Sequence, residues 1–279
     1  MNAQDNEPEL YWVAGNGTDV GKTTIACAAI RVLNAQGKRS VGFKPFGASL
    51  LHNIVDFIIE KYPNAPCKLF GGDAWKLTMA SPWTDIDSID LVSPIQTLCY
   101  SDWKTIILVR TGARLLGNVE YFCSEYGHSL KDRPDFRRLI DYTGLPMDDA
   151  VVVEDLDRDT TAAMAPEKQK HAFGKLLDLG VDAVVCEGAG RWISTWPDCP
   201  PANHLLFVAD GNVTLIPNLN WTLPAQNGSA LLCMREFKDF FTSPERQSYS
   251  IPLFIAETER RDEVAEQTVG DLLTEAKLI

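Results

Sequence analysis

Apolar segments alternate with glycines through the first fifty residues of the chain. The run "LYWVAG" ends at a glycine and predicts a short buried strand. The alanine-rich stretch from Lys22 places Ile25, Ala29 and Leu33 at helical spacing and ends before a glycine, which predicts a helix. "RSVGFKPF" predicts a second strand, broken by a proline. Together these segments form a βαβ unit, which implies a parallel sheet with a right-handed crossover.

The same rhythm returns in the second half of the chain. "KQKHAFGKLLDLG" predicts a helix with a glycine stop, and "VDAVVCEGAG" predicts a buried strand that ends in a glycine-rich turn. "VTLIPN" and "SIPLFIAE" predict further core strands, and "RRDEVAEQTVGDLLTEAKLI" predicts a closing surface helix. The region between is less regular. We interpret it as an insertion at about residues 100–165 in a single domain that spans residues 1–279.

A glycine-rich turn, "GNGTDVGKTT", joins the first strand to the first helix. Successive backbone N–H groups in such a turn, with a helix N-terminus behind them, form a binding site for phosphate. We expect Lys22 to reach the terminal phosphates and the Thr23 hydroxyl to complete a magnesium shell. The expected fold is therefore α/β of the P-loop NTPase type, a mostly parallel sheet flanked by helices. The expected nucleotide-binding residues are Gly15, Asn16, Gly17, Thr18, Asp19, Val20, Gly21, Lys22, Thr23 and Thr24.

Three charged residues stand where ligands bind in an open α/β sheet, at the carboxyl ends of strands. Lys44 follows the second strand and is suited to neutralise a phosphoryl group or a substrate carboxylate. Glu187 follows the strand "VVC" and is suited to face a magnesium–nucleotide complex. Asp73 opens a helix in "FGGDAWKLTMA". Taken singly, a snorkelling lysine, a solvated glutamate and a helix N-cap explain these residues equally well.

The net charge of the chain limits which classes of binding partner are expected. The chain carries a formal charge of -12 without a block of Lys or Arg, so nucleic acid and anionic membranes are not expected as partners, whereas a small phosphorylated ligand is. Its seven cysteines form no C-x-x-C pair, and Cys27 and Cys186, which lie in apolar periodic segments, are expected to be small buried residues in a reducing compartment. The polar start "MNAQDNEPEL" is unlike a signal peptide, and no apolar run reaches the ~20 residues of a membrane span. We therefore expect a cytoplasmic protein.

Other conspicuous residues are explained without a site. The four histidines lack metal-ligand spacing. "EDLDRD" is interpreted as a solvated acidic loop, and Arg137 and Arg138 as a helix surface paired with acidic neighbours. Trp192 and Trp196 fit burial in the core or at a subunit contact at least as well as the wall of a pocket.

Four segments together resemble the dethiobiotin synthetase family. The spacing of Gly15 and Gly21 matches the family's longer phosphate loop, which accounts for Asn16 at the place where a strict P-loop has glycine. "GFKP" and "GGDAWKL" resemble the family's strand-two lysine motif and aspartate segment, and "CEGAGRW" is similar to its V-E-G-A-G-G-W, all in family order. The resemblance implies a homodimeric ligase of biotin synthesis that uses ATP and Mg²⁺. In that family carbon dioxide adds to a diamine, ATP phosphorylates the carbamate, and closure of a cyclic urea expels phosphate.

The resemblance also implies roles for individual residues. Thr23, Asp73 and Glu187 would surround magnesium, and Lys22 would bind phosphates. Lys44 would stabilise the carbamate and the transferred phosphoryl group. The remaining implied residues are Thr18 and Asp19 near the nucleotide and diamine, and Ser49, Gly188, Ala189 and Gly190 at the substrate.

Departures from the family keep two other functions open. The family's G-x-x-L-G-x-I-N segment has no clear match in "VTLIPNLNWTLPAQNGS", and Glu257 and Thr258 stand in place of its base-reading Asn-Asp. Its serine after the strand-two lysine falls on Ala48, one residue before Ser49. One alternative is a divergent P-loop ATPase, ligase or kinase acting on a different small carboxylate or amine. The other is a nucleotide-gated switch with a protein partner, whose usual loop carries an additional lysine that this chain lacks.

Overall fold

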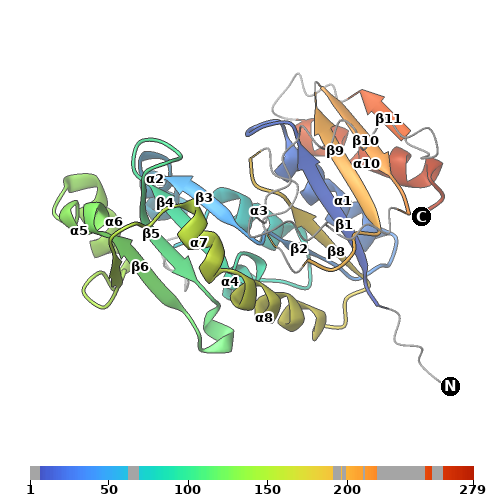
Figure 1. Cartoon of the computed structure of the whole chain (residues 1–279). Coiled ribbons are helices and arrows are strands. Elements are labelled where there is room, and N and C mark those ends of the chain that lie inside the picture. Colours follow the sequence, from blue (N-terminus) through green and yellow to red (C-terminus); the bar gives the residue numbers. More distant parts are fainter. Residues whose placement is uncertain are drawn as a thin grey trace.

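Helices flank two mixed β-sheets that lie side by side in the molecule (Figure 1). The computed structural model describes residues 7–61, 69–190, 196, 199–209, 211–218, 249–252 and 260–279. This arrangement confirms the α/β class, with a second sheet that the sequence pattern did not predict. Glu257, Thr258, Trp192 and most of "VTLIPNLNWTLPAQNGS" lie outside the described residues.

The strands are β1 (Glu9–Gly15), β2 (Ser40–Phe43), β3 (Gly47–Leu50), β4 (Ile95–Cys99), β5 (Ile106–Thr111), β6 (Glu120–Ser124), β7 (Val151–Val153), β8 (Ala183–Glu187), β9 (His204–Ala209), β10 (Asn212–Ile216) and β11 (Tyr249–Pro252). The helices are α1 (Lys22–Ala35), α2 (Leu51–Lys61), α3 (Gly72–Ala80), α4 (Ile89–Val92), α5 (Glu125–Ser129), α6 (Pro134–Thr143), α7 (Arg158–Met164), α8 (Pro166–Leu177) and α10 (Arg261–Glu275). Short 3₁₀ turns occur at Ile86–Ser88 and Arg114–Leu116.

The first sheet contains the expected βαβ unit and has the strand order β11-β10-β9-β1-β8-β2. β1 pairs in parallel with β8 on one side and β9 on the other, and β2 pairs in parallel with β8. β10 and β11 join antiparallel, so the sheet is mixed. The carboxyl ends of β1, β2 and β8 therefore meet at one edge, next to the start of α1.

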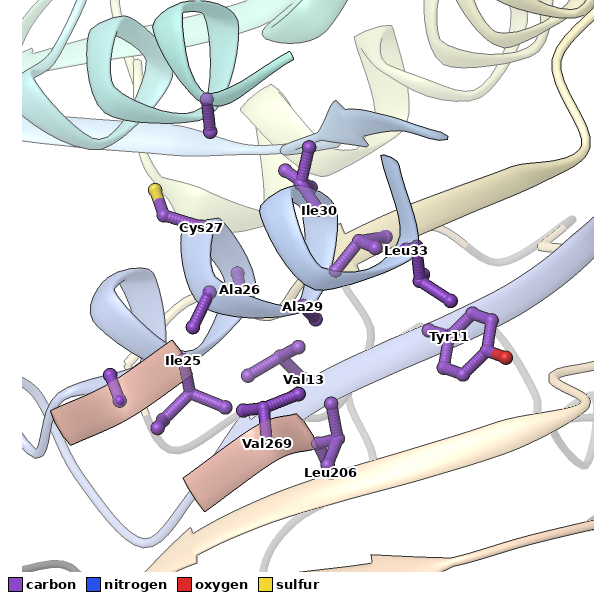
Figure 2. Close-up of a cluster of buried hydrophobic side chains, with 14 of the residues drawn as sticks. Tyr11, Val13, Ile25, Ala26, Cys27, Ala29, Ile30, Leu33, Leu206 and Val269 are labelled. Atoms are coloured by element: carbon purple, nitrogen blue, oxygen red, sulfur yellow. The ribbon is translucent and has the colours of Figure 1, made fainter. Parts of the chain in front are cut away.

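Apolar residues of β1 alternate between the two faces of this sheet, each of which is covered by helices. Tyr11 and Val13 face α1, where they pack with residues such as Ile25 and with Val269 of α10 (Figure 2). On the opposite face, Trp12 joins a cluster of aromatic and aliphatic side chains beneath α8. Trp196 belongs to this cluster and packs against Phe43 and Phe173. Of the environments considered for this tryptophan, burial in the core is therefore the one that the structure shows.

The second sheet has the order β3-β4-β5-β6-β7 and its own apolar core beneath α2 and α6. β3 and β4 pair in parallel, β4, β5 and β6 are antiparallel neighbours, and β6 and β7 are parallel. The sheet begins at Gly47, well before the insertion boundary expected near residue 100. Directly after Phe46, the chain thus passes from the edge of the first sheet into the second.

A buried arginine ties the second sheet to the loops around it. Arg110 of β5 is fully buried and donates hydrogen bonds to the carbonyl oxygens of Leu69 (2.8 Å), Gly112 (2.7 Å) and Ser93 (2.5 Å). Because an unpaired charge is costly to bury, these carbonyl acceptors are what allow it to lie in the interior. The segments before α3 and β4 are held in place by this side chain.

Most residues of the two charged segments discounted as sites are exposed, although Arg158 of "EDLDRD" also lines a cavity. Asp157 in "EDLDRD" caps α7 by accepting a hydrogen bond from the Thr160 amide at 2.8 Å. Arg137 pairs with Asp141 on α6, and Arg138 pairs with Asp56 of α2 at 3.1 Å, which confirms a helix surface paired with acidic neighbours. No helix in the described part of the chain combines the length and apolar character needed to cross a bilayer.

Candidate functional site

The glycine-rich turn connects the end of β1 to the first residue of α1. Asp19 and Gly21 have positive φ angles of 57° and 97°, so the turn passes twice through the left-handed region. The Asn16 amide donates to the Val208 carbonyl oxygen at 3.3 Å, which fixes the turn to β9. Gly21 precedes α1 and supplies no side-chain cap, so the first-turn amides of α1 have no side-chain acceptor. A turn of this kind in front of a helix N-terminus is suited to bind an anion.

Lys22 folds back over this turn. Its side-chain ammonium donates a hydrogen bond to the carbonyl oxygen of Gly17, and the residue is 5% exposed. Burial lowers the pKa of Lys22, while the negative charges of Glu187, Asp73 and Asp19 oppose that effect. A buried ammonium held inside the loop is placed to meet a phosphate oxygen there.

Four side chains from separate elements converge beside this loop. The Thr23 hydroxyl oxygen lies 2.9 Å from Asp73 Oδ1 and 2.9 Å from Glu187 Oε1. The Lys44 ammonium lies 2.9 Å from Asp73 Oδ2 and 2.8 Å from Glu187 Oε1. Since α1, α3 and the ends of β2 and β8 supply these groups, the expectation that they would meet at the sheet edge agrees with the structure.

Charge pairing perturbs the ionisation of the cluster. Burial alone would lower the pKa of Lys44, but the charges of Asp73 and Glu187 outweigh it and raise that pKa. The charge of Lys44 lowers the pKa of Asp73 to about 2. Burial raises the pKa of Glu187, whose side chain is 2% exposed, and Lys44 only partly offsets this. Clusters perturbed in this way are typical of functional sites.

The donor set fits a hard cation such as Mg²⁺, which prefers oxygen ligands and few carboxylates. A threonine hydroxyl has one proton, so Thr23 can donate to one of its two carboxylate neighbours at a time. Glu187 Oε2 is buried and has no hydrogen-bond partner among the described residues. Within the same ranges, no three His, Cys, Asp or Glu side chains are grouped as metal ligands, so Asp73 and Glu187 would need Thr23, phosphate oxygens or water to complete a shell.

A cavity of about 470 Å³ opens over the cluster. The expected residues that line it are Thr18, Asp19, Gly21, Lys22, Thr23, Thr24, Lys44, Asp73, Glu187, Ala189 and Gly190. The volume lies within the usual range for small-molecule sites. Residues of both the glycine-rich loop and the buried cluster therefore line the cavity.

Six expected residues do not line the cavity: Gly15, Asn16, Gly17 and Val20 of the loop, Ser49 and Gly188. Ser49 accepts a hydrogen bond from the Gln96 amide at 3.2 Å, and its neighbour Ala48 lines the cavity instead. The Gly188 amide donates to the Val13 carbonyl oxygen at 2.9 Å, so it is occupied within the sheet. Asp73 is not an N-cap, because α3 begins at Gly72 and Gly71 occupies the cap position.

Sequence reasoning missed the rest of the cavity wall. These residues come from the link after β2, from the second sheet and its hairpin, and from α3, α7 and α10: Phe46, Lys76, Thr97, Cys99, Trp103, Ile106, Arg158, Ala162 and Arg261. The proline that interrupts the second predicted strand lies directly before Phe46, the first residue of this part of the wall. No sequence motif indicated the other residues.

Comparison with known proteins adds no relative. No protein-family model matches the chain, and no curated protein matches its sequence. A function must therefore be supported by the geometry of the loop, the buried cluster and the cavity.

Proposed function

We propose that the chain is a P-loop enzyme that uses ATP and Mg²⁺ to activate a small substrate, with a dethiobiotin synthetase-like cyclo-ligation as the first candidate reaction. The observation that carries the proposal is the Thr23 hydroxyl, 2.9 Å from both Asp73 and Glu187, at the start of the helix that follows the phosphate loop. Asp73 and Glu187 lie 50 and 164 residues from Thr23 along the chain. Their convergence on one hydroxyl beside an anion nest is the arrangement that a metal-chelated triphosphate requires.

The residues of the site divide the work by position. Loop amides and Lys22 bind and orient the phosphate oxygens, and Thr23, Asp73 and Glu187 would hold magnesium. When bound, magnesium supplies positive charge that offsets the charge of the phosphates. Lys44 adds a buried ammonium next to the same carboxylates and is positioned to stabilise an anionic group on the acceptor side. The protein contributes mainly positioning and charge stabilisation.

A second candidate is an ATP-dependent ligase or kinase with a different acceptor. The observation that favours it is the second sheet, whose residues Thr97, Cys99 and Ile106 form part of the cavity wall. The nucleotide-gated switch stays an alternative without such an observation. A homodimer and a cytoplasmic location stay predictions, and light scattering on the purified protein tests the first of them.

Nucleotide binding tests the common core of these proposals. Lys22→Met is expected to abolish binding of a fluorescent, non-hydrolysable ATP analogue in the presence of Mg²⁺, because the loop loses its ammonium. Lys175→Met, at a half-exposed lysine of α8, is the matched control and should bind like the wild type. Equal affinity for the three proteins would refute the phosphate site.

Measurements of ATP turnover distinguish the two candidate enzymes. Phosphate release from ATP that requires both bicarbonate and 7,8-diaminononanoate supports the cyclo-ligase. Release that is independent of the diamine, or that needs another small carboxylate or amine, supports the second candidate.

A further inference from the structure

Part of the cavity wall is formed by the second sheet, its approach from β2, and α7. We call this region the second-sheet compartment and define it by Phe46, Thr97, Cys99, Ile106, Arg158 and Ala162. Cys99 and Ile106 are 2% and 4% exposed, so they form a fixed wall rather than a solvated surface. Apart from Arg158, the six side chains are uncharged, and most are apolar.

Arg158 gives the compartment a positive charge. It is the first residue of α7, and its guanidinium donates a hydrogen bond to the Trp103 carbonyl oxygen at 3.0 Å. It forms no ion pair with a carboxylate in the described part of the chain. Burial raises the pKa of Cys99 to about 11; a hydrogen bond with Thr97 and the charge of Arg158 oppose this rise, and the charge of Asp102 adds to it. The charge thus acts on the compartment wall, and the other N–H groups of Arg158 can still bind a ligand.

The acidic residues that line the cavity belong to other elements. Asp73 and Glu187 are paired with Lys44, and Asp19 belongs to the phosphate loop. Since the whole chain carries a formal charge of -12, a part of the cavity wall with an arginine and no carboxylate among its lining residues is a local exception. Such a place selects a ligand by direct contact with a cation and not by long-range attraction.

We propose that the second-sheet compartment binds the acceptor substrate, as an organic anion whose carboxylate or phosphate group contacts Arg158 and whose apolar body contacts Phe46 and Ile106. The inference rests on the proposed function, because an acceptor must share one cavity with the terminal phosphate of ATP. Arg158 is then a residue that determines specificity, and it takes no part in binding the nucleotide. Bidentate contact with a carboxylate or phosphate is the interaction for which a guanidinium is best suited.

Matched pairs of anionic and neutral probes test the charge requirement. The probes are octanoate with octanamide and 4-phenylbutyrate with 4-phenylbutyramide, and hexyl phosphate distinguishes a phosphate from a carboxylate. Each is titrated into wild-type protein saturated with Mg²⁺ and a non-hydrolysable ATP analogue, and the shift in melting temperature is recorded. We expect each anion to bind at least tenfold more tightly than its neutral partner. We expect Arg158→Ala to remove that preference and leave nucleotide affinity unchanged.

Two further variants keep the result interpretable. Arg138→Ala removes an exposed arginine that pairs with Asp56 outside the cavity and should behave as the wild type. Ala162→Trp fills the compartment and should weaken every probe, charged or neutral, without loss of nucleotide binding. Equal binding of anion and amide, or equal losses in Arg158→Ala and Arg138→Ala, would overturn the inference. Failure of the wild type to bind the ATP analogue would instead overturn the proposed function.

Discussion

Replacing Lys44 with methionine removes the ammonium that lies between two carboxylates. Lys44 Nζ is 2.8 Å from Glu187 and 2.9 Å from Asp73, and its side chain is 6% exposed. At an effective dielectric constant of about 20, each contact represents about 6 kcal/mol of attraction before desolvation is subtracted. Desolvation of the buried groups offsets most of this attraction. Methionine keeps the length of the side chain and leaves the packing largely intact, so the variant isolates the loss of charge.

Most of the expected loss of stability comes from Glu187, which stays buried without its ion-pair partner. Its side chain is 2% exposed, whereas that of Asp73 is 45% exposed and can be hydrated. Removing one partner of a buried ion pair typically costs about 3–5 kcal/mol, and we expect the free energy of unfolding to fall by that amount. The penalty requires an ionised Glu187. Burial already raises the pKa of this carboxyl group, so the penalty should be full at alkaline pH and should shrink as the pH falls and Glu187 gains a proton.

Urea denaturation of the wild type and Lys44→Met, at pH 8 and pH 5 and with or without Mg²⁺, measures these effects. We expect the difference in the free energy of unfolding between the two proteins to be largest at pH 8 without Mg²⁺. Lowering the pH to 5 or adding Mg²⁺ should each reduce this difference, because a proton or a metal ion can replace the missing charge. Lys38→Met is the matched control, since Lys38 pairs with Glu9 at 2.9 Å but both side chains are about one-third exposed. The free energy of unfolding of Lys38→Met should be lower than that of the wild type by no more than about 1 kcal/mol. A Lys44→Met penalty that equals the control, or that ignores both pH and Mg²⁺, would refute this account of the cluster.

Two further predictions concern the loop and a buried histidine. In Gly15→Ala the new Cβ would lie 2.7 Å from the Val208 carbonyl oxygen, so calorimetry should show weaker nucleotide binding, whereas Gly17→Ala meets only a side-chain carbon at 3.5 Å and should bind normally. Burial lowers the pKa of His204 from 6.5 to about 4, so the unfolded state takes up a proton first as the pH falls. The free energy of unfolding should therefore drop by about 3 kcal/mol between pH 7 and pH 4. His204→Gln should flatten that dependence in denaturant titrations, and the exposed His171→Gln should not; identical pH profiles would contradict the assignment.

Most of the first sheet (β1, β2, β8, β10 and β11) and the glycine-rich loop beside the cavity were predictable because their signals are local, whereas β9 was not predicted. The spacing of apolar residues after Lys22 predicts α1 from its first residue, and the apolar run before Glu187 predicts a strand that ends there, as β8 does. Once the strands are parallel, their carboxyl ends share an edge. The meeting of Lys44 with Glu187 follows from that rule without any knowledge of side-chain packing.

The second sheet was missed because its strands lack a clean pattern. β3 is "GASL", a sequence of small residues with low strand propensity, and β4 and β5 are buried on both faces, so polar and apolar residues do not alternate between water and core. Gln96 and Arg110 are fully buried, although either residue type would be assigned to the surface. The burial of such polar residues depends on long-range hydrogen bonds like the one from Arg110 to Leu69. The pattern of apolar and polar residues along the sequence carries no information about such contacts.

Because two sheets with separate apolar cores line one cavity, substitutions in one sheet can change its part of the wall without disturbing the core of the other sheet. In the proposed reaction, substitutions along β4, β5 or α7 would alter which acceptor molecule binds and would leave the proposed nucleotide-binding residues unchanged. A library confined to those three elements is thus a direct route to redirecting the chemistry of this fold.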